Sequence, residues 1–299
     1  MNHAKLGIEL THLRYFAVVA EELHFGRAAI KLGVSQPPLT QQIQRLEQRI
    51  GFALFERSTR RTALTEAGNA LLPIAQALLA DVDRGIDAAR KAGRGESGHL
   101  VVGTPPSVML AGLPKVIRWF RRKLPDVDLR LREVSTAAVI ESLNAGSVDV
   151  GFLRCPELPQ GLQELFRFRE NVVILLPANH PLAKTQKLKL EQLAAEPFVF
   201  FPRRLGAEFY DELLEHCRKA GFTPKVVQEA TQWSTVASLV EAGLGVSIGP
   251  ASISRLAARG CVARVLPDKW TTVLLASPKQ RLTATGEQFA AACRSQLVI

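Results

Sequence analysis

The sequence predicts an α/β protein with four successive parts: an all-α N-terminal domain that ends in a small hairpin, one long helix, a short hinge and a two-lobed α/β region. Two observations support this prediction. Apolar residues keep helical spacing through most of residues 10–92, whereas strand-like runs alternate with amphipathic helices through residues 99–299. A chain of 299 residues is also long enough for two or three compact units.

Three helices are expected within the N-terminal domain, residues 1–65. Apolar residues repeat at helical spacing over residues 13–23 and 28–32, and Gly33 ends the second helix. Ser35 is a suitable N-cap for a third helix. The two prolines of its first turn, residues 36–38, cost little because the amides there have no intrahelical acceptor.

The outer face of the third helix is polar and almost uncharged. Leu39, Ile43, Leu46 and Ile50 fall on one side of the helix, which turns the polar residues to the opposite side. Glutamine pairs with adenine in the major groove, and proline and the threonine methyl group contact thymine methyls. The predicted DNA-contacting residues of this helix are Ser35, Gln36, Pro37, Pro38, Thr40, Gln41 and Gln44.

Three arginines follow in the segment ERSTRR, residues 56–61, between two short apolar runs. Arg57, Arg60 and Arg61 are placed as in a hairpin wing that contacts phosphates or enters a minor groove. The helical pattern alone also fits a plain helical domain, and the arginines alone fit a solvated turn. Because both occur in this order within about forty residues, a winged helix-turn-helix that binds duplex DNA is favoured.

The same residues carry a family resemblance. The segments SQPPLTQQIQRLE, LFER and LTEAG resemble the signature of LysR-type transcriptional regulators, and the SQPPL form resembles the regulators of aromatic-compound degradation that respond to benzoate, muconate and chlorinated relatives. The resemblance implies a regulator of promoter DNA that is switched by a small effector. We expect no enzymatic activity and no cofactor, and we expect a homodimer or homotetramer.

One long helix is expected over residues 66–92, with Thr65 as its N-cap. Its apolar residues lie near heptad spacing, and Pro73 should bend it. The stripe consists of Leu71, Ala75, Leu78, Val82, Ile86 and Ala89. The helix either packs on its own domain or pairs with a second copy, and we favour a dimerising linker because duplex half-sites are related by two-fold symmetry. The segment GRGESG, residues 93–98, is a predicted hinge.

Residues 99–299 are expected to form parallel-sheet α/β units, because strand-like runs and helical patterns alternate there. Two such sets resemble the periplasmic-binding-protein-like effector domain of the LysR family, in which the last strand and helix return to the first lobe. The resemblance implies a first lobe of about residues 99–170 and 271–299, and a second lobe of about residues 171–270. A ligand is expected in the cleft between them.

Hydroxyl groups mark the predicted ligand site. Ser107 and Thr136 each follow a predicted strand at the start of a helix, where free amides and the helix dipole favour a carboxylate. Both also fall on positions that contact effector carboxylates in the aromatic-responsive LysR group. The alternative is that both are ordinary N-caps and that Arg154 forms a surface ion pair. The full predicted effector-binding set is Ser107, Thr136, Arg154, Phe201, Pro202 and Arg203.

Composition adds weaker constraints. The net charge of +10 suits an anionic partner, but residues 1–65 carry only nine Lys and Arg against five Asp and Glu, so most of the excess lies elsewhere. Four widely spaced cysteines form no metal-binding pattern and fit buried thiols in a reducing cytoplasm. No apolar run reaches the roughly 20 residues that span a bilayer, and the N-terminal residues lack the basic-then-apolar pattern of a secretion signal. A cytoplasmic location without a membrane partner or a metal is therefore expected.

Other functions are less consistent with the sequence. Residues 245–249 fit GxSxG, the nucleophile motif of serine hydrolases, but a helical pattern precedes Ser247 and Pro250 follows the motif, which is the wrong context. A solute-binding protein accounts for the two lobes but requires export. A nucleoid-type protein accounts for DNA binding but needs no ligand domain.

Overall fold

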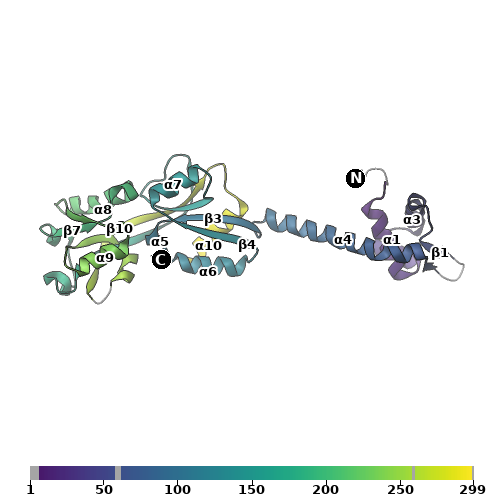
Figure 1. The fold of residues 1–299 in the computed structure, drawn as a ribbon, viewed down its shortest axis with the longest axis horizontal. Coiled ribbons are helices and arrows are strands. Elements are labelled where there is room, and N and C mark those ends of the chain that lie inside the picture. The colour runs from purple at the N-terminus through teal and green to yellow at the C-terminus, as the bar shows by residue number, and fades with distance from the viewer. Residues whose placement is uncertain (1–6, 58–61, 258–259, 298–299) are drawn as a thin grey trace. The chain divides into compact units, whose positions relative to one another are not determined.

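The chain forms two structural units in the computed structural model, residues 1–90 and residues 91–299. The structure describes residues 7–57, 62–257 and 260–297. The helix α4 (Glu66–Gly93) leads from the first unit into the second, as Figure 1 shows.

The first unit is the predicted three-helix domain with a hairpin. Its elements are α1 (Leu10–Glu22), α2 (Phe25–Leu32), α3 (Gln36–Ile50), β1 (Phe55–Arg57), β2 (Thr62–Leu64) and the start of α4. β1 and β2 pair in antiparallel fashion. Phe16, Leu39, Ile43, Leu46 and Leu54 are fully buried and form the centre of one apolar core.

Helix ends in this unit follow ordinary capping chemistry, with one departure from prediction. His24 caps α2, because its Nδ1 accepts the amides of Gly26 and Arg27. Thr65 Oγ1 accepts the amide of Gly68 at 3.0 Å, as expected for the N-cap of α4. Ser35 occupies the N-cap of α3, but its side chain makes no capping hydrogen bond.

The helix α4 continues through Pro73 and carries an uncovered apolar stripe. Ala75 is buried in the core of the first unit, whereas Leu78 and Ile86 are 46% and 44% exposed. Large apolar side chains exposed along one helix lose the stabilisation that burial would give them.

A six-stranded sheet dominates the second unit, in the order β4-β3-β5-β10-β6-β9. Its strands are β3 (Gly98–Thr104), β4 (Val127–Glu133), β5 (Val150–Arg154), β6 (Leu162–Pro177), β9 (Ser247–Pro250) and β10 (Cys261–Pro278). A second, parallel sheet pairs β7 (Pro197–Phe200) with β8 (Lys225–Glu229).

The expected parallel pairing holds for only part of this unit. β3 pairs in parallel with β4 and β5, but β10 runs antiparallel to β5 and β6, and β6 runs antiparallel to β9. The 16-residue β6 and the 18-residue β10 pair along their lengths. Charged residues interrupt the first half of β6, LQELFRFRE, so no continuous apolar run marks it as a strand.

Helices and short 3-10 turns cover these sheets. The helices are α5 (Pro106–Leu110), α6 (Leu113–Lys123), α7 (Thr136–Asn144), α8 (Ala207–Lys219), α9 (Trp233–Glu241) and α10 (Ala284–Gln296). The turns are η2 (Pro181–Lys184), η3 (Leu190–Leu193), η4 (Arg203–Leu205) and η5 (Ala251–Leu256).

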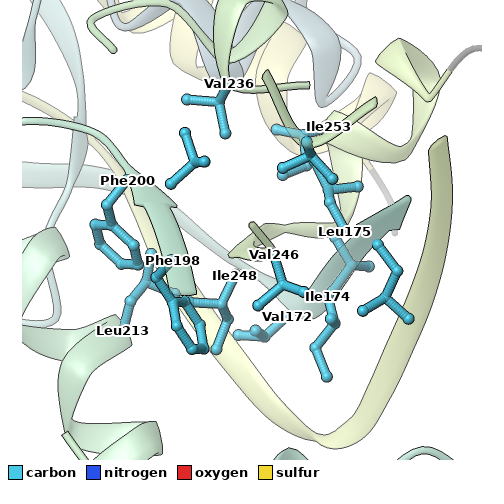
Figure 2. Packing of buried hydrophobic residues seen from close by; sticks show 14 of the residues in the cluster. Val172, Ile174, Leu175, Phe198, Phe200, Leu213, Val236, Val246, Ile248 and Ile253 are labelled. Carbon is cyan, nitrogen blue, oxygen red and sulfur yellow. The ribbon is translucent and has the colours of Figure 1, made fainter. Parts of the chain in front are cut away.

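Separate apolar cores define two lobes in this unit. The first lobe has its buried clusters among residues 100–168 and 273–297. The second lobe has its core among residues 172–266, where Figure 2 shows Phe198, Phe200, Ile174 and Ile248 packed together. β6 and β10 run through both lobes, and the changeover lies at Glu170 and Thr271, which are paired across the two strands.

Neither a membrane span nor a metal cluster is found in the part of the chain that the structure describes. No helix there is long and apolar enough to cross a bilayer. No group of three or more His, Cys, Asp and Glu side chains is arranged to hold a metal ion among those residues.

Candidate functional site

A cavity of about 170 Å³ lies between the two lobes. We call it the interlobe cavity. From the first lobe it is lined by Ser107, Glu133, Thr136 and Arg154, and from the second lobe by the side chains of Phe201, Leu205, Phe209 and Trp233. Thr231 and Gln232 of the second lobe also line it. The lining therefore combines aromatic rings with a few polar groups, which is the usual composition of a small-molecule site.

The sheet places the two hydroxyls side by side. β3 and β4 are parallel neighbours, so the segments after their carboxyl ends meet at one edge of the sheet. Ser107 is the second residue of α5 after β3, and Thr136 is the first residue of α7 after β4. Both side chains are buried, with 2% and 4% exposure.

Neither hydroxyl is a helix cap. Pro105 stands at the N-cap of α5, and Ser135 caps α7 by accepting the amide of Ala138 at 3.3 Å. The alternative that Ser107 and Thr136 are ordinary N-caps is therefore wrong. α5 has only five residues, and the prolines at its N-cap and first position have no N–H. In α7 the amide of Ala138 is taken by Ser135, and the amides of Thr136 and Ala137 have no intrahelical acceptor.

Arg154 is the central charge of the site and is 1% exposed. Its Nε donates to Ser107 Oγ at 2.7 Å, and its two terminal nitrogens donate to Thr271 Oγ1 at 3.1 Å and Glu170 Oε2 at 2.7 Å. Its guanidinium carbon also lies 5.3 Å from the centre of the Phe209 ring. Arg154 is thus the buried centre of a hydrogen-bonded network, and the alternative of a surface ion pair is wrong.

The network fixes the direction of the hydrogen bonds. Arginine nitrogens only donate, so Ser107 Oγ must accept from Arg154 and keeps its own proton to donate elsewhere. Thr136 Oγ1 likewise accepts the backbone amide of Arg154, at 3.4 Å, and keeps its proton. The buried wall of the interlobe cavity therefore offers two hydroxyl donors.

Glu170 extends the network into the second lobe. It accepts the backbone amide of Ser252, and Ser252 Oγ donates to the backbone oxygen of Ser107 at 3.3 Å. Glu170 is 7% exposed, so its charge and that of Arg154 neutralise each other out of contact with water. The network joins α5 of the first lobe to η5 of the second.

Stacked aromatic rings form the opposite wall. The rings of Phe201 and Phe209 lie 5.2 Å apart and 19° from parallel, and the Trp233 ring lies 5.5 Å from that of Phe201. Such a wall suits a flat or aliphatic ligand body.

Two predicted residues do not line this cavity. Pro202 is buried at the N-cap of η4, and Arg203 is exposed and pairs with Asp211 at 2.6 Å. Phe201 does line it. Of these three consecutive residues, only Phe201 lines the cavity.

Sequence reasoning missed Glu133, Glu170, Phe209, Trp233 and Thr271. Glu170 lies in the half of β6 that was not predicted as a strand, and Thr271, opposite it, is 101 positions away, so their proximity carried no local signal. Phe209 and Trp233 occur at apolar positions of helical patterns, which sequence periodicity assigns to a core.

One further carboxyl group lies behind the site. Burial raises the pKa of Glu212 on α8 to about 7, although the Arg154 charge and the Thr272 amide act in the opposite direction. Its Oε2 is buried without a hydrogen-bond partner among the described residues. The four cysteines are free and buried, and burial raises the pKa of Cys155 and of Cys217 to about 12, which keeps these thiols protonated and unreactive.

The predicted DNA-contacting residues of α3 share one face in the first unit. They surround a shallow hollow lined by Gln36, Pro37, Pro38, Thr40, Gln41 and Gln44. Ser35 is exposed at the start of the same face, whereas Leu39, Ile43 and Leu46 are buried on the opposite side. Arg57 ends β1, and Arg60 and Arg61 lie outside the described residues.

Comparisons with protein families cover nearly the whole chain. Residues 10–69 match the family described as bacterial regulatory helix-turn-helix protein, lysR family. Residues 93–298 match the LysR substrate binding domain.

Individual relatives and structures agree with these matches. The chain is 44% identical to the uncharacterised HTH-type transcriptional regulator YnfL of Escherichia coli strain K12, over 84% of this chain and 85% of that protein. It is 39% identical to the HTH-type transcriptional regulator AlsR of Bacillus subtilis strain 168, over 83% and 82%. Its structure resembles that of CbnR, a LysR family transcriptional regulator, with a TM-score of 0.81 and 28% identity over 95% of this chain and 99% of that one. A structure of full-length CbnR complexed with its target DNA gives a TM-score of 0.77 at the same identity, over 97% and 100%.

Proposed function

Because the chain belongs to the LysR family of transcriptional regulators, we propose that it reads operator DNA with α3 and alters that binding when a small carboxylate enters the interlobe cavity. The observation that carries the proposal is the pair of buried hydroxyls, Ser107 and Thr136, whose protons are left to donate into a cavity with an aromatic wall.

The DNA-reading part rests on α3. Gln36, Gln41 and Gln44 are exposed on the same face as Pro37 and Thr40, and amide side chains are suited to adenine edges in the major groove. The structural similarity to CbnR, which has been solved with its target DNA, supports the same use of this unit here.

The effector part rests on the chemistry of the cavity. A carboxylate accepts several hydrogen bonds, and the interlobe cavity offers two hydroxyl protons and the first-turn amides of α7, whose dipole also favours negative charge. The rings of Phe201, Phe209 and Trp233 receive the apolar body of the ligand.

Switching follows from the position of the cavity between lobes. A ligand held by Ser107 and Thr136 of the first lobe and by the aromatic rings of the second lobe binds best at one lobe separation. It therefore shifts the population toward that arrangement, in proportion to its differential affinity.

Assembly into a homodimer or larger homo-oligomer is part of the proposal. The exposed Leu78 and Ile86 of α4 leave an apolar stripe that a second α4 would bury, and two DNA-reading heads then meet two half-sites.

Titration calorimetry with benzoate and a panel of short aliphatic acids tests the effector site. Ser107→Ala and Thr136→Val should each weaken the binding of the best ligand about fivefold or more, since loss of one hydrogen bond costs about 1 kcal/mol. Ser238→Ala, on the exposed side of α9, is the control and should leave the affinity unchanged. Equal affinity in all four proteins, or no binding by any acid, would contradict the proposed site.

A further inference from the structure

The charged side chains that line the interlobe cavity determine which carboxylates it can bind. Only two of its lining residues ionise, Arg154 and Glu133. The charge of Arg154 is matched by Glu170 at 2.7 Å, so it adds no net attraction for an anion. Glu133 is the remaining charge, and it is negative.

Glu133 lies at the end of β4, on the same edge of the sheet as the two hydroxyls. It is exposed, and none of the described residues forms an ion pair or a side-chain hydrogen bond with its carboxylate.

We infer that the interlobe cavity is selective for monocarboxylates and that Glu133 rejects ligands carrying a second carboxylate. The inference rests on the proposed function in one respect, namely that Ser107 and Thr136 hold the first carboxylate. That carboxylate uses both hydroxyl donors and the α7 amides. A second carboxylate meets no unmatched cation in the lining and is repelled by Glu133.

Cavity size points the same way. At about 170 Å³ the space is close to the roughly 150 Å³ cavity that holds one benzene molecule in another protein. The space therefore suits a ligand with a single substituted ring or a short aliphatic chain, and a second charged group on so small a ligand stays within about one ring length of the first.

The repulsion can be scaled from Coulomb's law. Two like charges about 6 Å apart in a medium of effective dielectric about 40–80 repel by an amount that corresponds to an about three- to tenfold change in affinity. The high dielectric is appropriate because Glu133 is exposed.

The test compares two acids of similar size, 4-methylbenzoate and terephthalate, by calorimetry on the full-length protein. Wild type should bind 4-methylbenzoate and should bind terephthalate at least about threefold more weakly. Glu133→Gln should strengthen the binding of both acids, because Glu133 lies on the same edge of the sheet as the hydroxyls, and should strengthen terephthalate more, so that the ratio falls by about three- to tenfold. Glu141→Gln is the matched control, because Glu141 is also exposed but lies outside the cavity lining.

The salt dependence of the affinity ratio and the variant Ser107→Ala distinguish the role of Glu133 from that of the hydroxyl site. If charge repulsion sets the ratio, raising the ionic strength from about 0.05 to 0.5 M should narrow it in wild type and leave it unchanged in Glu133→Gln. Ser107→Ala should weaken both acids equally, because it removes the contact to the shared carboxylate.

The outcomes are distinct. Equal affinity of wild type for both acids, or the same ratio in wild type and Glu133→Gln, overturns the role of Glu133 while leaving the hydroxyl site intact. Unchanged affinities in Ser107→Ala overturn the hydroxyl site itself. Binding of neither acid to wild type overturns the monocarboxylate selectivity.

Discussion

Removal of Glu170 should destabilise the second structural unit far more than removal of a geometrically similar glutamate on the same strand. Glu170 and Glu164 both lie on β6, and each accepts from an arginine at 2.7 Å. The pair Arg154–Glu170 is 1% and 7% exposed, whereas the pair Arg167–Glu164 is 40% and 34% exposed. The distance to the arginine is therefore matched, and the pairs differ in burial and in the Ser252 amide that Glu170 also accepts.

The expected magnitudes follow from solvation. Glu170→Ala leaves the Arg154 charge buried without its counter-ion and should cost about 3–5 kcal/mol in the free energy of unfolding. Glu164→Ala breaks a pair that water already screens and should cost about 0–1 kcal/mol. Adding Arg154→Met to Glu170→Ala should recover part of the loss, because the unpaired charge is then gone.

Tryptophan fluorescence in a urea titration measures this directly. The chain has three tryptophans, Trp119, Trp233 and Trp270, and all of them lie in residues 91–299. The signal therefore reports the unfolding of the second unit without a contribution from the first. A cost for Glu170→Ala no larger than that for Glu164→Ala would refute the view that Arg154 is a buried charge held by Glu170.

Three further outcomes are expected. Gln36→Ala should weaken operator binding by about 1–3 kcal/mol and leave binding to random duplex DNA almost unaffected, because a base contact is lost while phosphate contacts remain. Fluorescence anisotropy titrations measure both affinities, and an equal loss of affinity for operator and random duplex would exclude a base contact by Gln36. The double variant Leu78→Glu with Val82→Glu should sediment as a folded monomer, because charged side chains replace the apolar stripe of α4. An oligomer of wild-type size would show that this stripe is not the contact between subunits. Glu212, whose pKa is raised by burial to about 7, binds its proton more tightly in the folded state, so the stability it contributes is full below about pH 4.5 and is lost as the pH rises through about 7. Glu212→Gln should therefore flatten the decline of the melting temperature between about pH 5 and 8 relative to wild type, and an unchanged pH profile would place the titration elsewhere.

Local patterns predicted the elements of the first unit well. The spacing of Leu39, Ile43 and Leu46 gave the buried side of α3, and Thr65 gave the start of α4, because both depend on neighbours within about one helical turn. His24 was not predicted as a cap, since histidine is rarely used there.

Long-range pairing explains what the sequence did not reveal in the second unit. β6 and β10 are antiparallel partners about 100 residues apart, and pairing at that separation leaves no local periodicity to detect. The same strands supply Glu170 and Thr271, so the hydrogen-bonded network around Arg154 could not be predicted either. The positions of Ser107 and Thr136 after parallel strands could be predicted because the carboxyl ends of such strands and the following helices can be located from the alternation of elements.

The most direct test of effector-controlled DNA binding is a nuclease footprint on the DNA upstream of the protein's own coding sequence, with and without benzoate. Wild type and the double variant Ser107→Ala with Thr136→Val should protect the same region in the absence of benzoate. Benzoate should then change the protected region or its half-saturation concentration for wild type only. Failure of wild type to protect any specific region, or the same benzoate response in both proteins, would contradict the account.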